Sequence, residues 1–210
     1  MSCYVIGIAG ASCSGKTTVC NKILDKVKQT TTNHNSMVCV LGQDNYYIDG
    51  DENDNRDIPE AIDFNLMTLH LKKLMNGESV DMPIYDFKTH KRTQEIKKIG
   101  PAEIIIVEGI LIFTQELRNL CNLRIFVESG DALCCIRRLI RDNKERGRTH
   151  EEIQKRYLEH VVPCFNTYIN PSKIHAHIIL LNNTHDSFIG LEILLDHIEK
   201  KICAYNIYDN

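Results

Sequence analysis

The sequence predicts an α/β fold in which a parallel β-sheet lies between two layers of helices. Five short runs rich in Val and Ile are typical of buried strands, and they cover residues 4–9, 37–41, 104–107, 123–127 and 177–181. Helical patterns separate these runs, and a glycine-rich segment joins the first run to the first helix. Strands that alternate with helices favour a parallel sheet covered on both faces, and such sheets bind ligands at the carboxyl ends of their strands.

The expected helices follow from the spacing of apolar residues and from signals at the helix ends. They cover residues 17–29, 64–76, 114–121, 131 to about 142, 149–169 and 187–202. Gly77 is a stop signal for the second helix. Thr149 and Glu152 have the spacing of a capping box, and Pro163 predicts a kink later in that helix.

The glycine-rich segment, residues 10–17, reads Gly-Ala-Ser-Cys-Ser-Gly-Lys-Thr and matches the GxxxxGK(S/T) phosphate-loop pattern. Such a loop points backbone N–H groups at phosphate oxygens, and the helix that follows adds the positive end of its dipole. Lys16 would bridge the outer phosphates, and Thr17 would hold Mg²⁺. The predicted nucleotide-binding residues are Gly10, Ala11, Ser12, Cys13, Ser14, Gly15, Lys16, Thr17 and Thr18. The alternative is a glycine-rich surface turn.

Two segments interrupt the alternation of strands and helices. Residues 48–60 are acidic and rich in turn-forming residues, which predicts a mobile surface connector. Residues 80–99 contain two short extended pieces and a basic run, which predict a small hairpin beside the sheet. Within this hairpin, Tyr85 and Phe87 are suited to a base-and-sugar pocket, although a hairpin core would use the same aromatic residues.

The composition indicates a globular, cytoplasmic protein. The chain has 210 residues, 43% of them hydrophobic, and we expect one domain over residues 1–210. The formal net charge of −3 gives no overall attraction to nucleic acid or to an anionic membrane. Nine cysteines without a CxxC pair fit neither a disulfide framework nor a zinc site, so we expect reduced thiols.

Two acidic residues follow predicted strands. Glu108 ends the run at 104–107, where a carboxylate could bind Mg²⁺ near the phosphate loop, directly or through its ligands. Asp44 follows the run at 37–41 and could accept the proton of an attacking hydroxyl group. The alternatives are a solvated strand end for Glu108 and an Asx turn for Asp44.

A basic segment at residues 137–148 predicts a lid that closes on phosphates. It contains six basic residues in twelve, and Arg138 and Arg141 share a helical face from which they could clamp a phosphate. Gly147 supplies a flexible point, and closure would bring Arg146 and Arg148 onto the charge that develops during transfer. The alternatives are a solvated helix face and a nucleic-acid-binding patch, the latter disfavoured by the acidic net charge.

Taken together, these residues resemble the uridine–cytidine kinase family within the phosphoribulokinase-like phosphate-loop kinases. The match runs in order from about residue 5 to residue 180. Its motifs are the phosphate loop, Gln43-Asp44-x-Tyr-Tyr47, Pro83-x-Tyr85-Asp86-Phe87-x-x-His90-x-Arg92, Glu108-Gly-Ile-Leu111, Arg138-x-x-Arg141-Asp142-x-x-Glu-Arg-Gly-Arg148 and Pro171-Ser-Lys173.

The resemblance implies a P-loop NTPase fold of three α/β/α layers, with five parallel strands, a nucleoside-side hairpin at about 80–99 and a helical lid at about 137–149. It implies phosphorylation of uridine or cytidine at the 5′-hydroxyl by ATP or GTP with Mg²⁺, in pyrimidine salvage. Family members are often homotetramers that are sensitive to feedback by pyrimidine triphosphates.

The resemblance also assigns roles to particular residues. Asp44 is the implied base, with Lys16 and Arg141 as further catalytic residues, and Thr17 and Glu108 hold Mg²⁺. The implied substrate-binding residues are Tyr47, Asp57, Tyr85, Phe87, His90, Arg138, Arg148 and Arg156. Within this set, Asp57 binds the ribose hydroxyls and Tyr85 and His90 contact the pyrimidine.

The sequence departs from the family pattern mainly around the acceptor. Arg56 replaces an aromatic residue, Ile58 replaces a His, Arg156 replaces a Gln, Leu181-Asn182-Asn183 replaces Pro-Arg-Gly, and His185 falls where an adenine-side acid is expected. A kinase for another riboside, such as nicotinamide riboside, therefore stays open. A nucleotide-dependent switch is the alternative from another class, although the base-recognition motif NKxD is incomplete at Asn143-Lys144.

Overall fold

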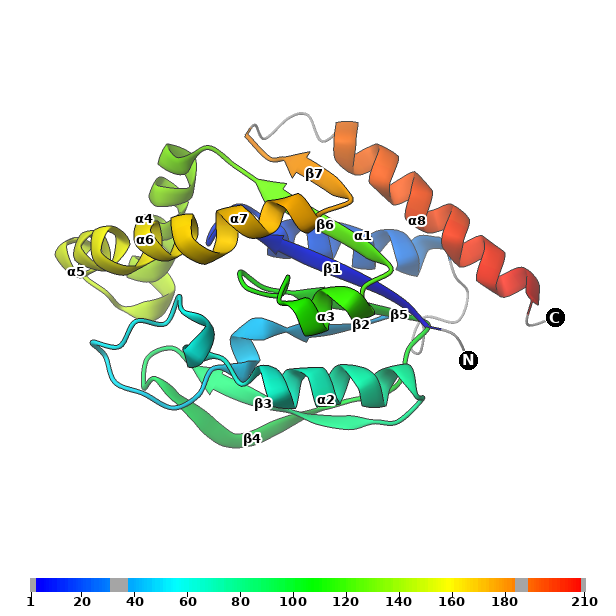
Figure 1. Cartoon of the computed structure of the whole chain (residues 1–210), viewed down its shortest axis with the longest axis horizontal. Coiled ribbons are helices and arrows are strands. Elements are labelled where there is room, and N and C mark those ends of the chain that lie inside the picture. The colour runs from blue at the N-terminus through cyan, green and yellow to red at the C-terminus, as the bar shows by residue number, and fades with distance from the viewer. Residues whose placement is uncertain (1–2, 31–37, 184–188, 209–210) are drawn as a thin grey trace.

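The central sheet has five parallel strands, as predicted. The computed structural model describes residues 3–30, 38–183 and 189–208. The strand order is β2-β5-β1-β6-β7, formed by β1 (Tyr4–Gly10), β2 (Val38–Gly42), β5 (Ile104–Glu108), β6 (Leu123–Glu128) and β7 (Ile178–Leu181) (Figure 1). Each expected apolar run became a strand, and Met37 of the second run lies outside the described residues. β1 is buried along its whole length because it has a neighbour on each side and helices on both faces.

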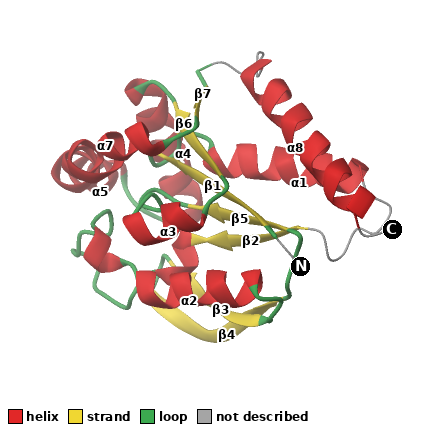
Figure 2. Ribbon diagram, turned by 45° about the vertical axis from the view of Figure 1, so that its right-hand side comes forward, coloured by secondary structure: helices red, strands yellow, loops and turns green. Residues whose placement is uncertain are grey.

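Helices cover the two faces of this sheet, which gives the three layers that the sequence predicted (Figure 2). On one face, α1 (Lys16–Thr30) and α8 (Ile189–Tyr208) contribute Ile23 and Leu194 to a buried cluster with β1 and β6. On the other face, α2 (Phe64–Met75) and α3 (Gln115–Leu120) contribute Met67 and Leu117. The first residues of the predicted helix 187–202 lie outside the described residues. Within the described ranges, no helix is long and apolar enough to cross a membrane.

The lid helix is longer than the sequence predicted, and the helical segments that follow it are less regular. α4 (Asp131–Arg146) continues four residues past the expected end, because the stop comes from Gly147, whose φ of 69° allows a left-handed cap. The capping box of Thr149 and Glu152 begins α5 (His150–Arg156) as expected. Around Pro163 the chain stays helical through α6 (Val162–Cys164) and α7 (Asn170–Ser172), with π-helical stretches at Tyr157–Val161 and Phe165–Ile169 instead of a simple kink.

The hairpin forms a separate two-stranded antiparallel sheet, as predicted. β3 (Val80–Asp86) pairs with β4 (Lys91–Ile99), and the register shifts between Pro83 and Tyr85. In Figure 1 this hairpin lies beside α2, at the edge of the molecule opposite α8.

The connector at residues 48–60 differs from the surface segment that the sequence predicted. Residues 51–54 are exposed, but Asp57 is buried. The backbone N–H of Gly50 donates to the carbonyl of His90 at 3.0 Å, and Arg56 donates to the hydroxyl of Tyr85 at 2.6 Å. These bonds tie the connector to the hairpin, and the prediction missed them because they join segments far apart in the sequence.

Candidate active site

A cavity of about 390 Å³ lies where the strand ends, the hairpin tip and the lid meet. It is lined by sixteen of the predicted site residues: Ser12, Cys13, Gly15, Lys16, Thr17, Thr18, Asp44, Tyr47, Asp57, Phe87, His90, Glu108, Arg138, Arg141, Arg148 and Arg156. The predicted residues Gly10, Ala11, Ser14 and Tyr85 are not among the lining residues. The lining also includes Arg56, Ile110, Arg137, Arg146, His160 and Asn182.

The phosphate loop has the backbone geometry that its glycines predict. Gly10 has φ of 147° and Gly15 has φ of 103°, and a Cβ atom at Gly10 would overlap the carbonyl oxygen of Val127. Nζ of Lys16 donates to the carbonyl of Ala11 at 2.8 Å, so the lysine closes the loop from inside. Because α1 begins at Lys16, the positive end of its dipole faces the cavity, which suits a phosphate group.

Asn182 supports this loop, and the sequence analysis missed that role. Its side-chain Nδ2 donates to the carbonyl of Ser14 at 2.8 Å, and a Cβ atom on Gly15 would overlap the same amide. Asn182 follows β7, 168 residues away from Ser14 in the chain. We had noted this position only as a departure from the family pattern, because no local signal indicates a contact over that distance.

The two predicted magnesium ligands lie together. Oγ1 of Thr17 and Oε1 of Glu108 are 3.5 Å apart, because α1 begins beside the carboxyl end of β5. Burial raises the pKa of the Glu108 carboxyl, and the nearby Lys16 ammonium group opposes that rise. A hydroxyl and a carboxylate oxygen are the kinds of donor that Mg²⁺ prefers, so this pair fits the ion.

Asp44 lines the cavity from a short 3₁₀ turn, Gln43–Tyr46, that is fixed on both sides. The buried Gln43 accepts a hydrogen bond from the backbone of Leu111 at 2.8 Å, and Arg92 donates to the carbonyls of Tyr46 and Tyr47 at 3.1 and 2.9 Å. Nδ2 of Asn45, the residue after Asp44, donates to the carbonyl of Gly42 at 3.4 Å. Asp44 therefore faces the cavity from a firmly held backbone.

Aromatic rings and arginines form the wall opposite the phosphate loop. Tyr47, Tyr85 and Phe87 pack with ring centroids 5.1 to 5.6 Å apart. Tyr85 is not among the residues that line the cavity, and its hydroxyl accepts a hydrogen bond from Arg56 at 2.6 Å. Its side chain thus helps to hold Arg56 in the wall, and the substrate contact that the resemblance implied for Tyr85 stays a prediction.

His90 and Asp57 are the buried polar groups of this wall. His90 has φ of 56°, and its Nδ1 meets no hydrogen-bonding partner among the described residues. Burial, followed by the positive charges of Arg148 and Arg156, lowers the pKa of His90 below its usual value. The lowered pKa favours the neutral imidazole, and Nδ1 is open to a hydrogen bond with a ligand.

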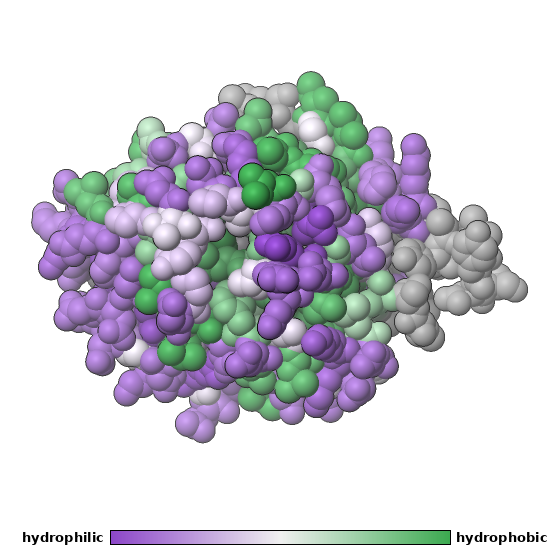
Figure 3. Space-filling view, in the orientation of Figure 1, coloured by the Kyte–Doolittle hydropathy of each residue, from purple (hydrophilic) through white to green (hydrophobic). Residues whose placement is uncertain are grey.

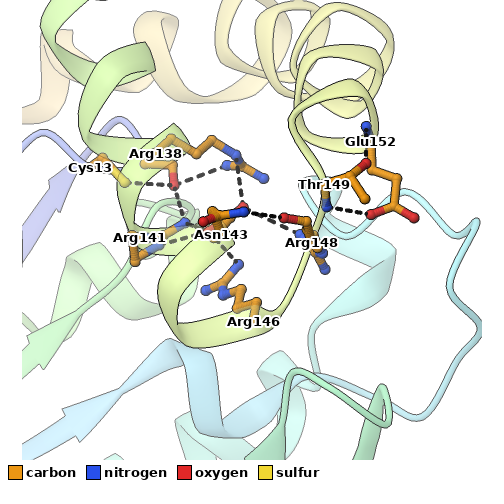
Figure 4. Close-up of polar contacts among 10 residues, drawn as sticks. Cys13, Arg138, Arg141, Asn143, Arg146, Arg148, Thr149 and Glu152 are labelled. Atoms are coloured by element: carbon orange, nitrogen blue, oxygen red, sulfur yellow. Dashed lines mark hydrogen bonds and ion pairs between the residues drawn. The ribbon is translucent and has the colours of Figure 1, made fainter.

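The arginines of the lid meet at Asp142. Figure 4 shows the four arginines, Arg138, Arg141, Arg146 and Arg148, close together. The carboxylate of Asp142 forms ion pairs with Arg138, Arg141, Arg146 and Arg148 at 2.8 to 3.5 Å. Asp142 is fully buried, so the alternative of a solvated helix face is wrong for this side of α4. All four arginines are among the residues that line the cavity.

A family model matches this site and most of the chain. The model described as "Phosphoribulokinase / Uridine kinase family" covers residues 5–186. The chain belongs to the phosphoribulokinase/uridine kinase family. Among curated members, "Uridine kinase" of Aliivibrio fischeri (strain MJ11) is 37% identical over 210 residues, covering 96% of each chain. "Uridine kinase" of Lactobacillus johnsonii is 40% identical over 184 residues, covering 84% of this chain and 85% of its own.

Solved structures show the same fold at lower sequence identity. A putative fructose transport system kinase from Silicibacter sp. TM1040 has a TM-score of 0.68 at 18% identity, covering 85% of this chain and 89% of its own. A possible uridine kinase from Bacillus stearothermophilus has a TM-score of 0.56, with the same identity and coverage. These neighbours support the three-layer fold of a phosphate-loop kinase for this member of the phosphoribulokinase/uridine kinase family.

Proposed function

We propose that this protein is a uridine kinase, which transfers the γ-phosphoryl group of ATP or GTP to the 5′-hydroxyl of uridine or cytidine and so forms UMP or CMP in pyrimidine salvage. The curated relatives named uridine kinase support the choice of acceptor. The observation that carries the proposal is that Lys16 and Asp44 line one cavity together with Asp57. One enclosed space thus holds a phosphate-binding loop and a carboxylate suited to orienting a hydroxyl group.

The donor side would bind the triphosphate through backbone and charge. The N–H groups of the phosphate loop and the N-terminus of α1 would receive its phosphate oxygens, and Lys16 would leave the carbonyl of Ala11 for the outer phosphates. Thr17 and Glu108 would hold Mg²⁺, which neutralises phosphate charge when it is bound.

The acceptor side would place the sugar hydroxyl in line with the γ-phosphorus. Asp44 would accept a hydrogen bond from the 5′-hydroxyl and take its proton as the new O–P bond forms and the bond from phosphorus to the β–γ bridging oxygen breaks. Asp57 would bind the ribose hydroxyls, and His90, with Nδ1 unpartnered among the described residues, would meet the base.

The positive charge of the cavity suits the transfer step. Eight basic side chains and three acidic ones line the cavity, so the wall carries an excess of positive charge. Arg138 and Arg141 would stabilise the charge that spreads over the phosphoryl oxygens, Arg148 would contact the acceptor, and the lid that carries them would exclude water.

The proposal is tested by comparing acceptors and by changing Asp44. Uridine, cytidine, nicotinamide riboside and adenosine are supplied with ATP or GTP, and nucleoside diphosphate release is measured. We expect uridine or cytidine to give the highest kcat/KM. Preferential phosphorylation of nicotinamide riboside would contradict the proposed acceptor.

The substitution Asp44→Asn should lower kcat by about 100-fold or more, because the amide orients the hydroxyl less well and accepts no proton. Nucleotide binding, measured by calorimetry, should stay close to that of the unmodified protein, because Asp44 belongs to the turn after β2 and not to the phosphate loop. Asn45→Asp, which changes the neighbouring side chain of the same turn, is the matched control. Near-normal turnover in Asp44→Asn would remove Asp44 from the mechanism.

A further inference from the structure

Asp142 joins four arginines through one buried carboxylate on α4. Oδ1 of Asp142 lies 2.8 Å from Arg141 and 3.5 Å from Arg146. Oδ2 lies 3.4 Å from Arg138 and 3.3 Å from Arg148. The cluster therefore holds four positive charges against one negative charge, which leaves charge available for an anionic ligand.

Two of these arginines, the donor-side pair, face the phosphate loop. Nη1 of Arg138 lies 3.1 Å from Oγ of Ser12, and Nη2 of Arg141 lies 3.5 Å from the same atom. Ser12 belongs to the glycine-rich segment and lines the cavity. The donor-side pair is thus within reach of phosphate groups bound at the loop.

The other two arginines, the acceptor-side pair, face the hairpin. The guanidinium group of Arg146 lies 3.9 Å from the ring centroid of Phe87. Arg148 lines the cavity with His90, and its charge contributes to the lowered pKa of that histidine. Arg148 reaches Asp142 because the chain reverses at Gly147, and the N–H of Arg148 also donates to the carbonyl of Asp142 at 3.2 Å.

Each oxygen of Asp142 therefore bridges one donor-side and one acceptor-side arginine. We propose that Asp142 is a positioning residue that couples nucleotide binding to acceptor binding. The identity of the acceptor in this proposal rests on the proposed function. No other described carboxylate has recorded ion pairs with both pairs of arginines.

The coupling follows from competition for guanidinium groups. Phosphate oxygens bound at the loop draw the donor-side pair away from Asp142, because bidentate phosphate contacts are strong. The carboxylate then has only Arg146 and Arg148 as partners and holds them more firmly against the acceptor wall. A pre-ordered wall binds the acceptor more tightly, and the acceptor must strengthen nucleotide binding by the same factor.

The ionisation state of Asp142 supports this role. Burial alone would raise the pKa of its carboxyl group, but Arg141, Arg138 and Arg146 lower it below the usual range. Burial and the neighbouring Arg156 lower the pKa of Arg148 to about 10, so Arg148 is still charged at pH 7. The ion pairs therefore persist throughout the neutral pH range.

The first experiment needs no acceptor. Phenylglyoxal modification of each arginine is followed by mass spectrometry with and without a non-hydrolysable ATP analogue. We expect the analogue to slow modification of Arg146 and Arg148 by several-fold in the unmodified protein, and to leave their modification nearly unchanged in Asp142→Asn. The proposal would be overturned if the modification rates of these two arginines did not change with the analogue, or if they changed equally in the unmodified protein and in Asp142→Asn.

The second experiment measures the coupling directly. The Kd of the ATP analogue is determined by calorimetry with and without saturating uridine, and the ratio of the two values is the coupling factor. We expect a factor of about five or more in the unmodified protein, at the lower end of the usual allosteric range. The factor should fall close to 1 in Asp142→Asn and to an intermediate value in Asp142→Glu, whose longer side chain displaces both oxygens.

Glu145→Gln is the matched control, because it removes the same charge from an exposed position on the same helix. It should leave the coupling factor unchanged. Thermal melts show whether each variant is folded. If Asp142→Asn does not fold, the proposal is tested by the labelling of the unmodified protein and by the coupling factor of Asp142→Glu. An unchanged factor in a folded Asp142 variant refutes the coupling role. Failure of uridine to bind the unmodified protein would instead refute the proposed acceptor, and the labelling experiment would still test Asp142.

Discussion

The two sides of the cavity are built in different ways. The donor side consists mostly of backbone, held between β1 and α1, with Lys16 and Thr17 as its main side chains. The acceptor side consists of side chains from the connector, the hairpin and the lid, such as Arg56, Phe87 and Arg156. A backbone cradle recognises any triphosphate, whereas a wall of separate side chains can change its ligand by single substitutions. The departures from the family pattern at positions 56 and 156 lie on that second side.

The largest expected effect comes from disturbing the donor backbone. Gly10→Ala should destabilise the fold by about 3 kcal/mol or more and abolish nucleotide binding, because the new Cβ atom overlaps the carbonyl of Val127 at a positive φ. Thermal unfolding and calorimetry with ATP measure the two effects. Gly100→Ala is the control, since a Cβ atom there meets nothing within 4 Å. Normal nucleotide binding by Gly10→Ala would mean that the loop can change its backbone conformation and still bind phosphate.

A smaller effect is expected on the acceptor side. Arg56→Gln loses the hydrogen bonds to Tyr85 and Ile48, so the acceptor wall loosens. We expect the KM for the nucleoside to rise about tenfold, which corresponds to one charged hydrogen bond, while the KM for ATP changes by less than about twofold.

Arg56→Lys separates the charge of Arg56 from its shape, because lysine keeps the charge but lacks the planar fork. Lys97→Gln, at an exposed position on the hairpin, controls for the loss of a positive charge. Equal increases in both KM values for Arg56→Gln would show that the two sides of the cavity are not separable.

The smallest expected effect is a dependence of folding stability on pH, and it comes from His70, which contacts the turn that carries Asp44. Nδ1 of the buried His70 lies 2.9 Å from the hydroxyl of Tyr46, and burial lowers the pKa of His70 below its usual value. The unfolded chain therefore binds a proton at this histidine more readily than the folded protein, so stability should fall as the pH drops below about 6.5.

Replacing His70 with Gln should reduce the loss of melting temperature between pH 7.5 and 5.5 by roughly 2 to 4 °C, the change that about 1 kcal/mol makes in a domain of this size. The exposed His150 is the control position, with the substitution His150→Gln. An identical pH dependence in the unmodified protein and in His70→Gln would exclude His70 as a source of acid sensitivity.

Local sequence signals predicted most of the fold and most of the donor side. The five strands and the phosphate loop are encoded in contiguous residues, so periodicity and one motif were enough to find them. The length of α4 and the π-helical stretches around Pro163 were missed, because helix ends and widened turns depend on packing as much as on local propensity.

Contacts between distant segments could not be predicted in the same way. In the sequence, Asp142 is one acidic residue in a charged helical segment. Only the fold shows that it is fully buried among four arginines. The hydrogen bond between Arg56 and Tyr85 was also missed, because it depends on how the hairpin packs against the connector. The sequence thus predicted many residues that line the cavity, but not the contacts that hold them in place.

The bond between Asn182 and Ser14 has a consequence for how the protein is made. The loop at the beginning of the chain receives one of its supporting contacts from a residue near the end, after the edge strand β7. A ribosome must therefore have released residue 182 before this contact can form. A nascent chain that still lacks Asn182 would hold nucleotide less well than a chain that contains it, which delays full binding until β7 and the residues after it have been made.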